Sequence, residues 1–246
     1  SLYQPVYGSD DDLVLYLPFN GPNGSIQYDR SPYGNDGTQY NDVTCNASYG
    51  KYGVGCYFNK NSLAYIDLGA PDSLNINQTD GVTTSFWMKL SPDQAEFYDP
   101  LSWGHSGTHG IVFQGAGATL TVIFATGTMC DAPYTPDLRD NVWHHLAAVK
   151  SSDGLFLYLD GVLDASDTGN SCQIPVNLSS RNVYIGRDAI NTRIMDGSMD
   201  EVRVYKRALS AEEIRTHYLR GSGHGASGAI TANEFRIVNT SGNVDF

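Results

Sequence analysis

The stretch MDEVRVYKRALSAEEI, residues 199–214, combines the two local patterns that decide the fold. Its first part belongs to an alternating run, residues 198–205, with the period of two that is typical of a β-strand. Its second part places Ser210 three residues before Glu213, which is the spacing of a capping box, ahead of the apolar Ile214. The stretch therefore predicts a strand followed by a short helix over residues 209–219 that closes the domain.

The rest of the chain repeats the strand pattern. Runs of four to nine residues, rich in β-branched and aromatic side chains and separated by turn residues, occupy residues 13–19, 55–58, 65–68, 82–90, 110–114, 120–125, 143–150, 155–159 and 182–186. The segment LYLDGVLDAS, residues 157–166, reads as two strands around Asp160-Gly161, which is a hairpin signal. This pattern predicts an all-β protein, a two-sheet antiparallel jelly-roll sandwich with one short C-terminal helix.

The chain divides near residue 220. Residues 1–220 are predicted to form the jelly-roll domain. Residues 221–228, GSGHGASG, read as a flexible linker, and the tail to residue 246 contains one further strand at residues 234–239. Because the tail is too short for its own core, we expect that strand to pair with the body, with a partner, or with chain outside this sequence.

Charge narrows the choice of partners. The chain has 15 basic and 27 acidic side chains, so its formal net charge is 15 − 27 = −12, and the basic ones are scattered. This argues against a nucleic-acid partner, which requires clustered Lys and Arg. No apolar run approaches the roughly 18–20 residues of a membrane span. The chain begins with Ser, and we expect either a removed leader or a piece of a longer protein.

Four cysteines allow three disulfide pairings. Cys45 and Cys56 flank a turn-rich stretch, and Cys130 and Cys172 lie in loops, so we predict the pairs 45–56 and 130–172. Zinc binding is a weaker alternative because no CxxC spacing occurs. The other alternative is four free thiols in a cytosolic protein. An even number of cysteines in loops favours an oxidising, extracellular setting.

Several segments together resemble the laminin-G-like, concanavalin A-like lectin/glucanase jelly-roll family. They occur in the family's order over roughly residues 12–218: LVLYLPFNG with DRSPYGNDGT, GKYGVGCYFN with YIDLG, SLNI with VTTSFWMKL, NVWHHLAAVK, GLFLYLDGVLDAS, NVYIGRD and MDEVRVYKRALSAEEI. The last segment is the most specific. The resemblance implies the same sandwich fold.

The resemblance also implies a structural Ca²⁺. Family members often hold the ion with the loop after the first strand and the acid of the last strand. Carried over, the ligands are Asn20, the Gly21 carbonyl, Asp29 and Asp200. Oxygen-only ligands on a turn suit Ca²⁺. An Asx-turn loop without a metal is the alternative.

A second candidate site lies in long loops at the rim of the sandwich. Sugar binding requires an aromatic platform and planar polar partners. Three predicted loops, residues 99–109, 129–139 and 187–193, supply these side chains: Trp103, His105, His109, Tyr134, Arg187, Asp188, Asn191 and Arg193.

The sequence contains no recognisable set of catalytic residues. The Glu-x-Asp-x-x-Glu run of glucanases with this superfold is absent, and Asp200 and Glu201 are neighbours expected to face opposite ways. His144 and His145 also alternate, so they cannot bind one metal. We therefore predict a noncatalytic recognition or adhesion module at a cell, filament or virion surface that binds glycans or surface proteins. The alternatives are a fibre subunit that assembles through its tail strand and a glycosidase accessory domain.

Overall fold

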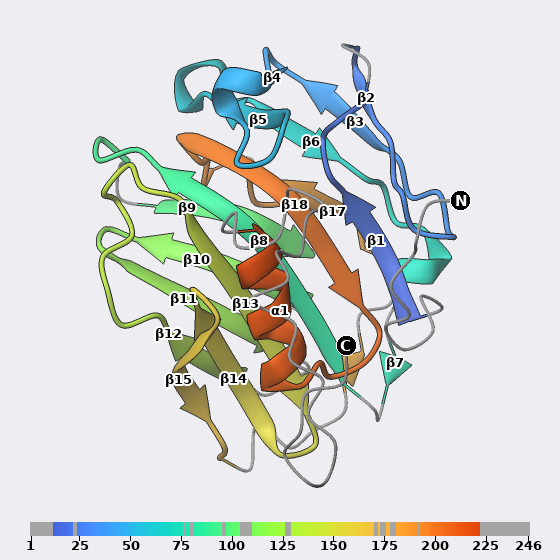
Figure 1. The fold of residues 1–246 in the computed structure, drawn as a ribbon, viewed down its shortest axis with the longest axis vertical. Helices are drawn as coiled ribbons and strands as arrows, with labels where there is room; N and C mark the ends of the chain where they lie inside the picture. Colours follow the sequence, from blue (N-terminus) through green and yellow to red (C-terminus); the bar gives the residue numbers. More distant parts are fainter. Residues whose placement is uncertain are drawn as a thin grey trace, which may run out of the picture.

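Two antiparallel sheets pack face to face in the computed structural model, as Figure 1 shows. The structure describes residues 12–21, 24–75, 77–78, 81–94, 97–103, 110–125, 129–169, 172, 176–177, 181–190 and 192–221. The predicted all-β jelly-roll sandwich with one short helix is confirmed. The predicted tail strand, and with it the fibre-subunit alternative, lies outside the described residues.

The first sheet, sheet A, contains the strand of the signature stretch. In spatial order its strands are β15 (Val162–Asp167), β14 (Gly154–Leu159), β13 (His144–Ser151), β8 (Val82–Leu90), β18 (Gly197–Tyr205), β5 (Gly55–Phe58) and β4 (Thr44–Asn46). The opening strand β1 (Leu13–Leu17) also pairs with β18. The last strand thus bonds to the first one, although nearly the whole chain separates them in sequence.

The second sheet, sheet B, faces it. Its order is β12 (Met129–Pro133), β11 (Thr119–Ala125), β10 (Gly110–Ala116), β9 (Phe97–Trp103), β17 (Val183–Ile185), β6 (Tyr65–Asp67), β3 (Gly37–Tyr40) and β2 (Ile26–Gln27). A separate pair joins β7 (Asn77–Gln78) to β16 (Val176–Asn177). Three short 3₁₀ turns lie in the connections: Ala47–Tyr49, Lys60–Ser62 and Asp72–Leu74.

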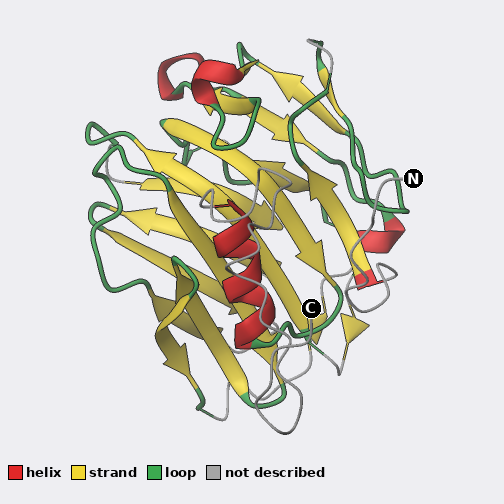
Figure 2. Cartoon of the chain, in the orientation of Figure 1, coloured by secondary structure: helices red, strands yellow, loops and turns green. Residues whose placement is uncertain are grey.

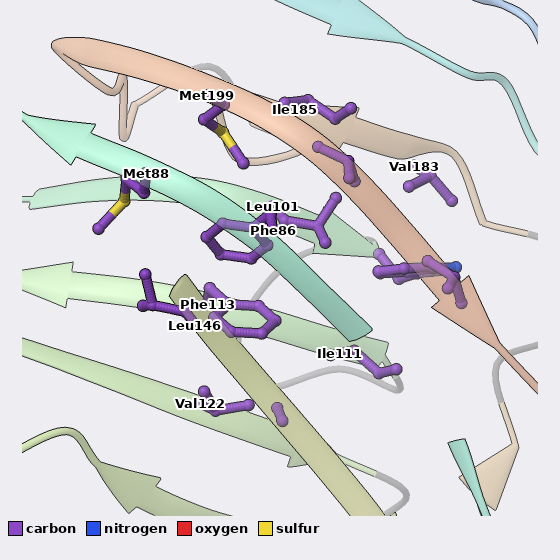
Figure 3. Packing of buried hydrophobic residues seen from close by; sticks show 14 of the residues in the cluster. Phe86, Met88, Leu101, Ile111, Phe113, Val122, Leu146, Val183, Ile185 and Met199 are labelled. Atoms are coloured by element: carbon purple, nitrogen blue, oxygen red, sulfur yellow. The ribbon is translucent and has the colours of Figure 1, made fainter. Parts of the chain in front are cut away.

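The core lies between the sheets. Alternate residues of each strand enter it, and Phe86 of sheet A meets Phe113 of sheet B edge to face, with ring centroids 4.9 Å apart (Figure 3). Met88, Leu101 and Leu146 surround this pair and are buried. This apolar layer explains why one face of every long strand is hydrophobic, and it leaves the opposite faces available for other contacts.

The helix α1 (Ala211–Gly221) lies across the outer face of sheet A, as Figure 2 shows. The predicted capping box forms: Ser210 Oγ accepts from the Glu213 N–H at 3.3 Å, and Glu213 Oε2 accepts from the Ser210 N–H at 2.8 Å. Ile214 is buried with Val149 of β13. The helix therefore covers that face.

His145 of β13 is fully buried on this covered face, next to Trp87, with ring centroids 5.3 Å apart. His144 instead contacts Asp140 and Asp160, so the predicted alternation of the two histidines is confirmed. Burial lowers the pKa of His145 well below its usual value, and the nearby His217 and Arg203 lower it further. The imidazole is therefore neutral.

The cysteine pairs and the hairpin form as predicted. Cys45 bonds to Cys56 and Cys130 bonds to Cys172. Asp160 and Gly161 connect β14 to β15 with φ values of 49° and 77°, which are the positive φ angles that a two-residue hairpin turn requires. Within the described part of the chain, no helix is long and apolar enough to cross a membrane.

Two local predictions were wrong. Residues 99–103 and 129–133, which we expected to lie in rim loops, belong to β9 and β12. Glu201 adopts a φ of 55° in a bulge of β18. This extra residue breaks the alternation. Asp200 is opposite Trp87 and Arg203 is opposite Ser85, so Asp200 and Arg203 lie on the same face of the sheet. The Glu201 carboxylate contacts Arg203. Asp200 and Glu201 therefore reach the same face.

Candidate functional site

Three tyrosines form an aromatic stripe on the outer face of sheet B. Tyr40 of β3 stacks on Tyr65 of β6, with centroids 4.9 Å apart, and Tyr65 meets Tyr184 of β17 edge to face at 6.1 Å. Ile66 and Ile185, their sequence neighbours, point into the core, so the alternation of each strand directs these tyrosines outward. Tyr40 is 43% exposed. We call Tyr40, Tyr65 and Tyr184 the tyrosine platform.

Arg187 extends the platform. Its guanidinium carbon lies 3.5 Å from the centroid of the Tyr65 ring and 4.4 Å from that of Tyr184. Such stacking holds a planar cation in a fixed orientation. Burial raises the pKa of Tyr65, and Arg187 opposes that rise, so the phenol keeps its proton at neutral pH and can donate a hydrogen bond.

A polar cluster adjoins the platform on the same sheet. Arg193 Nη1 donates to Gln114 Oε1 of β10 at 2.5 Å and lies 4.0 Å from Asp99 Oδ1 of β9. Asp188 accepts hydrogen bonds from the N–H groups of Thr192 and Arg193 at 2.8 and 3.1 Å. These bonds fold the connection after β17 back onto the sheet and fix the position of Arg193.

The Asp99 carboxyl group is the most unusual member of the cluster. Its side chain is fully buried, and neither oxygen has a hydrogen-bond partner among the described residues. Burial raises the pKa of Asp99 to about 8, with Arg193 lowering it and Asp188 raising it. At neutral pH this carboxyl group is therefore largely protonated, which avoids a buried charge.

The rim prediction finds only part of this face. Arg187, Asp188 and Arg193 do lie together, whereas His105, His109 and Asn191 lie outside the described residues. Trp103 is 0% exposed within β9, and Tyr134 is 2% exposed with its hydroxyl donating to the Ala147 carbonyl. Neither ring can therefore serve as a surface platform, because both are buried in the core.

Sequence reasoning missed the tyrosine platform. The signal was present in two short runs, YID at residues 65–67 and VYI at residues 183–185, where tyrosine alternates with a core residue. What the runs could not show is that β3, β6 and β17 are neighbours in one sheet. The sequence did not identify Asp99 and Gln114 as site residues, because a single acid or amide in a strand is common.

The residues predicted to hold Ca²⁺ separate into two groups. Asn20 Oδ1 accepts from the Val54 N–H at 2.7 Å, and Asp200 Oδ2 accepts from the Lys51 and Tyr52 N–H groups at 2.8 Å each. Asn20 and Asp200 thus converge on one turn, residues 51–54. Burial raises the pKa of Asp200 to about 7, and Glu201 adds to the rise while the Tyr52 and Lys51 N–H groups oppose it.

Asp29 belongs to a different arrangement. Its two oxygens accept four hydrogen bonds, from the N–H groups of Tyr16, Ser31 and Asn35 and from the Ser31 hydroxyl. A carboxylate offers about four lone-pair positions, so this one has none left for a cation. The Asp200 carboxylate also accepts from the Glu201 N–H at 2.7 Å through Oδ1. By the same count, Asn20 Oδ1 and Asp200 each keep about one lone pair, whereas Asp29 keeps none.

One other cluster has the composition of a metal site. Among the described residues, Cys130, Asp167 and Cys172 are the only group of three or more His, Cys, Asp or Glu side chains whose ligand atoms lie within 4.8 Å of one another. Its two sulfurs form a disulfide, so they are not thiolate ligands. The zinc alternative for the cysteines is therefore wrong.

Comparisons with known proteins agree with this fold. Residues 60–215 match the family model of the concanavalin A-like lectin/glucanases superfamily. The human adhesion G-protein coupled receptor D1 is 26% identical over 149 residues, which are 58% of this chain and 17% of the receptor. The chain thus spans about a sixth of that relative's length.

Two solved structures share the fold at low identity. Domain 4 of AbnA, an extracellular arabinanase from Geobacillus stearothermophilus solved with arabinotriose, has a TM-score of 0.67 and 18% identity, covering 83% of this chain and 97% of that one. The binding domain of botulinum neurotoxin DC, solved with rat synaptotagmin II, has a TM-score of 0.68 and 12% identity, covering 86% of this chain and 52% of that one. With a family model that matches well over half of its residues, the chain belongs to the concanavalin A-like lectin/glucanases superfamily.

Proposed function

We propose that this chain is a noncatalytic extracellular recognition module that binds glycans on the outer face of sheet B. The observation that carries the proposal is the tyrosine platform with Arg187 stacked on it. Aromatic rings bind the apolar faces of sugar rings, and a fixed guanidinium donates paired hydrogen bonds to hydroxyl or carboxyl oxygens. The platform spans three strands, which suits an extended ligand of more than one sugar.

Two further observations support the setting. The two disulfides favour an oxidising compartment, where such bonds form and persist. The AbnA domain was solved with an oligosaccharide, and the receptor relative is named for adhesion. Attachment to a surface glycan as part of a larger protein is consistent with both observations.

A glycan array followed by calorimetry tests the proposal. We expect a subset of glycans to bind the full chain, and Tyr65→Ala to weaken that binding at least about tenfold, because Tyr65 holds both the exposed Tyr40 ring and the Arg187 guanidinium in place. Tyr33→Ala is the matched control, since exposed Tyr33 contacts Lys206 rather than sheet B. Equal binding by the wild type and Tyr65→Ala would remove the platform from the proposal. If no glycan binds the full chain, the glycan-binding proposal is wrong.

We further propose that Asn20, the Gly21 carbonyl and Asp200 hold a structural Ca²⁺. Support comes from the lone pairs that remain after the described hydrogen bonds, about one on Asn20 Oδ1 and one on the Asp200 carboxylate, in two side chains that contact the same turn, residues 51–54. A cation there would favour the charged form of Asp200, whose pKa burial raises to about 7. The ion would cross-link the loop after β1 to β18.

A further inference from the structure

Helix α1 is held on sheet A by few apolar contacts. Ile214 is the only buried side chain among residues 211–219. It packs with Ala147, Val149 and Leu209 in a small cluster that is separate from the core between the sheets. Figure 2 shows the helix outside both sheets. Undocking of α1 would therefore leave the main core intact, which is the condition for a local opening.

His145 of β13 lies beneath this helix. Its ring is fully buried, with its centroid 6.4 Å from that of Tyr218 on α1 and 5.3 Å from that of Trp87, on which Tyr218 stacks at 5.7 Å. Neither Nδ1 nor Nε2 has a hydrogen-bond partner among the described residues. The helix thus covers an imidazole whose nitrogens are unpaired, and such burial costs free energy.

The charges around the ring oppose a proton on it. The titratable and charged side chains that face His145, directly or across Trp87, are His217 and Tyr218 of α1, Arg203 of β18, Asp160 after β14, and Lys51 and Tyr52 of the turn at residues 51–54. Asp160 accepts the His145 backbone N–H at 2.8 Å and also contacts His144. On β18, Glu201 pairs with Arg203, and Asp200 accepts from the turn. None of these carboxylates bonds to the His145 ring.

Opening of the interface would remove this obstacle. A histidine in water has a pKa near 6.5, whereas burial, His217 and Arg203 hold the pKa of the docked ring well below that value. Because the pKa is lowered in the docked state, the stability that His145 contributes is present above pH 6.5 and is lost as the pH falls below it. With the docked ring neutral, the equilibrium constant for opening rises about 25-fold from pH 7 to pH 5.

We propose that α1 is an acid-released latch, which is docked on sheet A at neutral pH and undocks in mildly acidic solution when His145 takes up a proton. The proton comes from water that reaches the ring only in the open state. Release uncovers Trp87 and frees the end of α1 to which residues 222–246 are attached. The latch does not depend on the glycan proposal, because the tyrosine platform belongs to sheet B.

Native-state hydrogen exchange of the full chain at pH 7 and pH 5 tests the latch. The exchange rate of each amide, divided by its intrinsic rate at that pH, gives an opening constant. For residues 215–218 we expect this constant to rise about 25-fold at pH 5. It should exceed that of the β10 and β11 amides at least about tenfold, because those strands lie in sheet B and report global unfolding. Equal constants in α1 and these strands, or no rise in α1, would overturn the proposal.

Four variants assign the response. His145→Phe keeps a flat ring beside Trp87 and takes up no proton, so α1 should open equally often at both pH values. His145→Gln does the same without a ring and serves if the first variant fails to fold. His144→Gln is the matched control, because its ring contacts Asp140 and Asp160 instead, and it should keep the rise. His217→Gln should also keep it. A rise that survives without His145, or one that disappears in His217→Gln, would show that His145 is not the trigger.

Discussion

The central carbon of the Arg187 guanidinium lies 3.5 Å from the centroid of the Tyr65 ring. The two residues are far apart in sequence and meet only because β6 and β17 are neighbours in sheet B. Arg187 is therefore held in place by an aromatic surface that is itself a candidate ligand platform. This relationship makes the side-chain geometry, rather than charge alone, the property to test.

Arg187→Lys keeps the charge and removes the planar group. Because an ammonium neither stacks nor donates two parallel hydrogen bonds, we expect about a tenfold loss of glycan affinity by calorimetry. Arg215→Lys, at an exposed position on α1, is the control and should bind like the wild type. Full affinity in Arg187→Lys would show that only its charge matters.

Calcium removal should lower stability if Asn20 and Asp200 hold the ion. We expect a lower Tm after EDTA treatment and recovery with added Ca²⁺, since a ligand at a hundred times its Kd stabilises the fold by about 2.7 kcal/mol. Asp200→Asn should abolish the response to Ca²⁺, whereas Asp42→Asn, at an exposed turn, should retain it. An unchanged wild-type Tm would refute the calcium proposal.

Asp99 should make the protein less stable as the pH rises. In the unfolded chain this carboxyl group loses its proton near pH 4, but in the fold its pKa is about 8, so between these values the folded state holds one proton more. The contribution of Asp99 to the free energy of unfolding is therefore most favourable below pH 4 and is lost progressively as the pH rises to 8. Asp99→Asn should flatten this slope and stabilise the protein by roughly 2 kcal/mol at pH 8, measured by urea unfolding. If the stability of Asp99→Asn depended on pH as steeply as that of the wild type, Asp99 would not be the cause of the pH dependence.

His144 should have a different pH signature. Its hydrogen bond to Asp160, at 2.8 Å, and the one to Asp140, at 3.0 Å, raise its pKa to about 9 against the opposing effect of burial. Because the pKa of His144 is raised, its ion pairs stabilise the fold fully below about pH 6.5, and this stabilisation disappears as the pH rises through 9. We expect His144→Ala to cost about 1 kcal/mol at pH 6, a value reduced for solvent screening, and clearly less at pH 10. A pH-independent difference would mean that packing, not charge, is lost.

The two disulfides should differ in their contribution to stability. They close loops with sequence separations of 11 for Cys45–Cys56 and 42 for Cys130–Cys172. By loop entropy alone, replacing a pair with serine should cost about 3 kcal/mol for the shorter loop and about 4 kcal/mol for the longer one. Urea unfolding of the two double variants measures this order, and the reverse order would point to structure retained in the unfolded chain.

Local patterns in the sequence determined most of the fold. Strand periodicity, the Asp160-Gly161 turn and the Ser210–Glu213 cap depend on neighbours within a few residues, so they can be identified without coordinates. The core followed from the same alternation, because each strand has to bury its apolar face. The family resemblance implied the sandwich architecture, but the order of the strands in each sheet came from the structure.

Only the tertiary structure decided which polar and aromatic side chains share a surface. Trp103 and Tyr40 are both aromatic residues at strand ends, yet the first is in the core and the second is exposed. Asp99 is a buried acid without a hydrogen-bond partner among the described residues, and Arg193, 94 positions later in the sequence, lies 4.0 Å from it. In a regular strand, alternation along the sequence determines the face to which a residue points, and a bulge such as the one at Glu201 breaks that rule. Strand order and loop coverage decide what lies beside the residue and whether water reaches it.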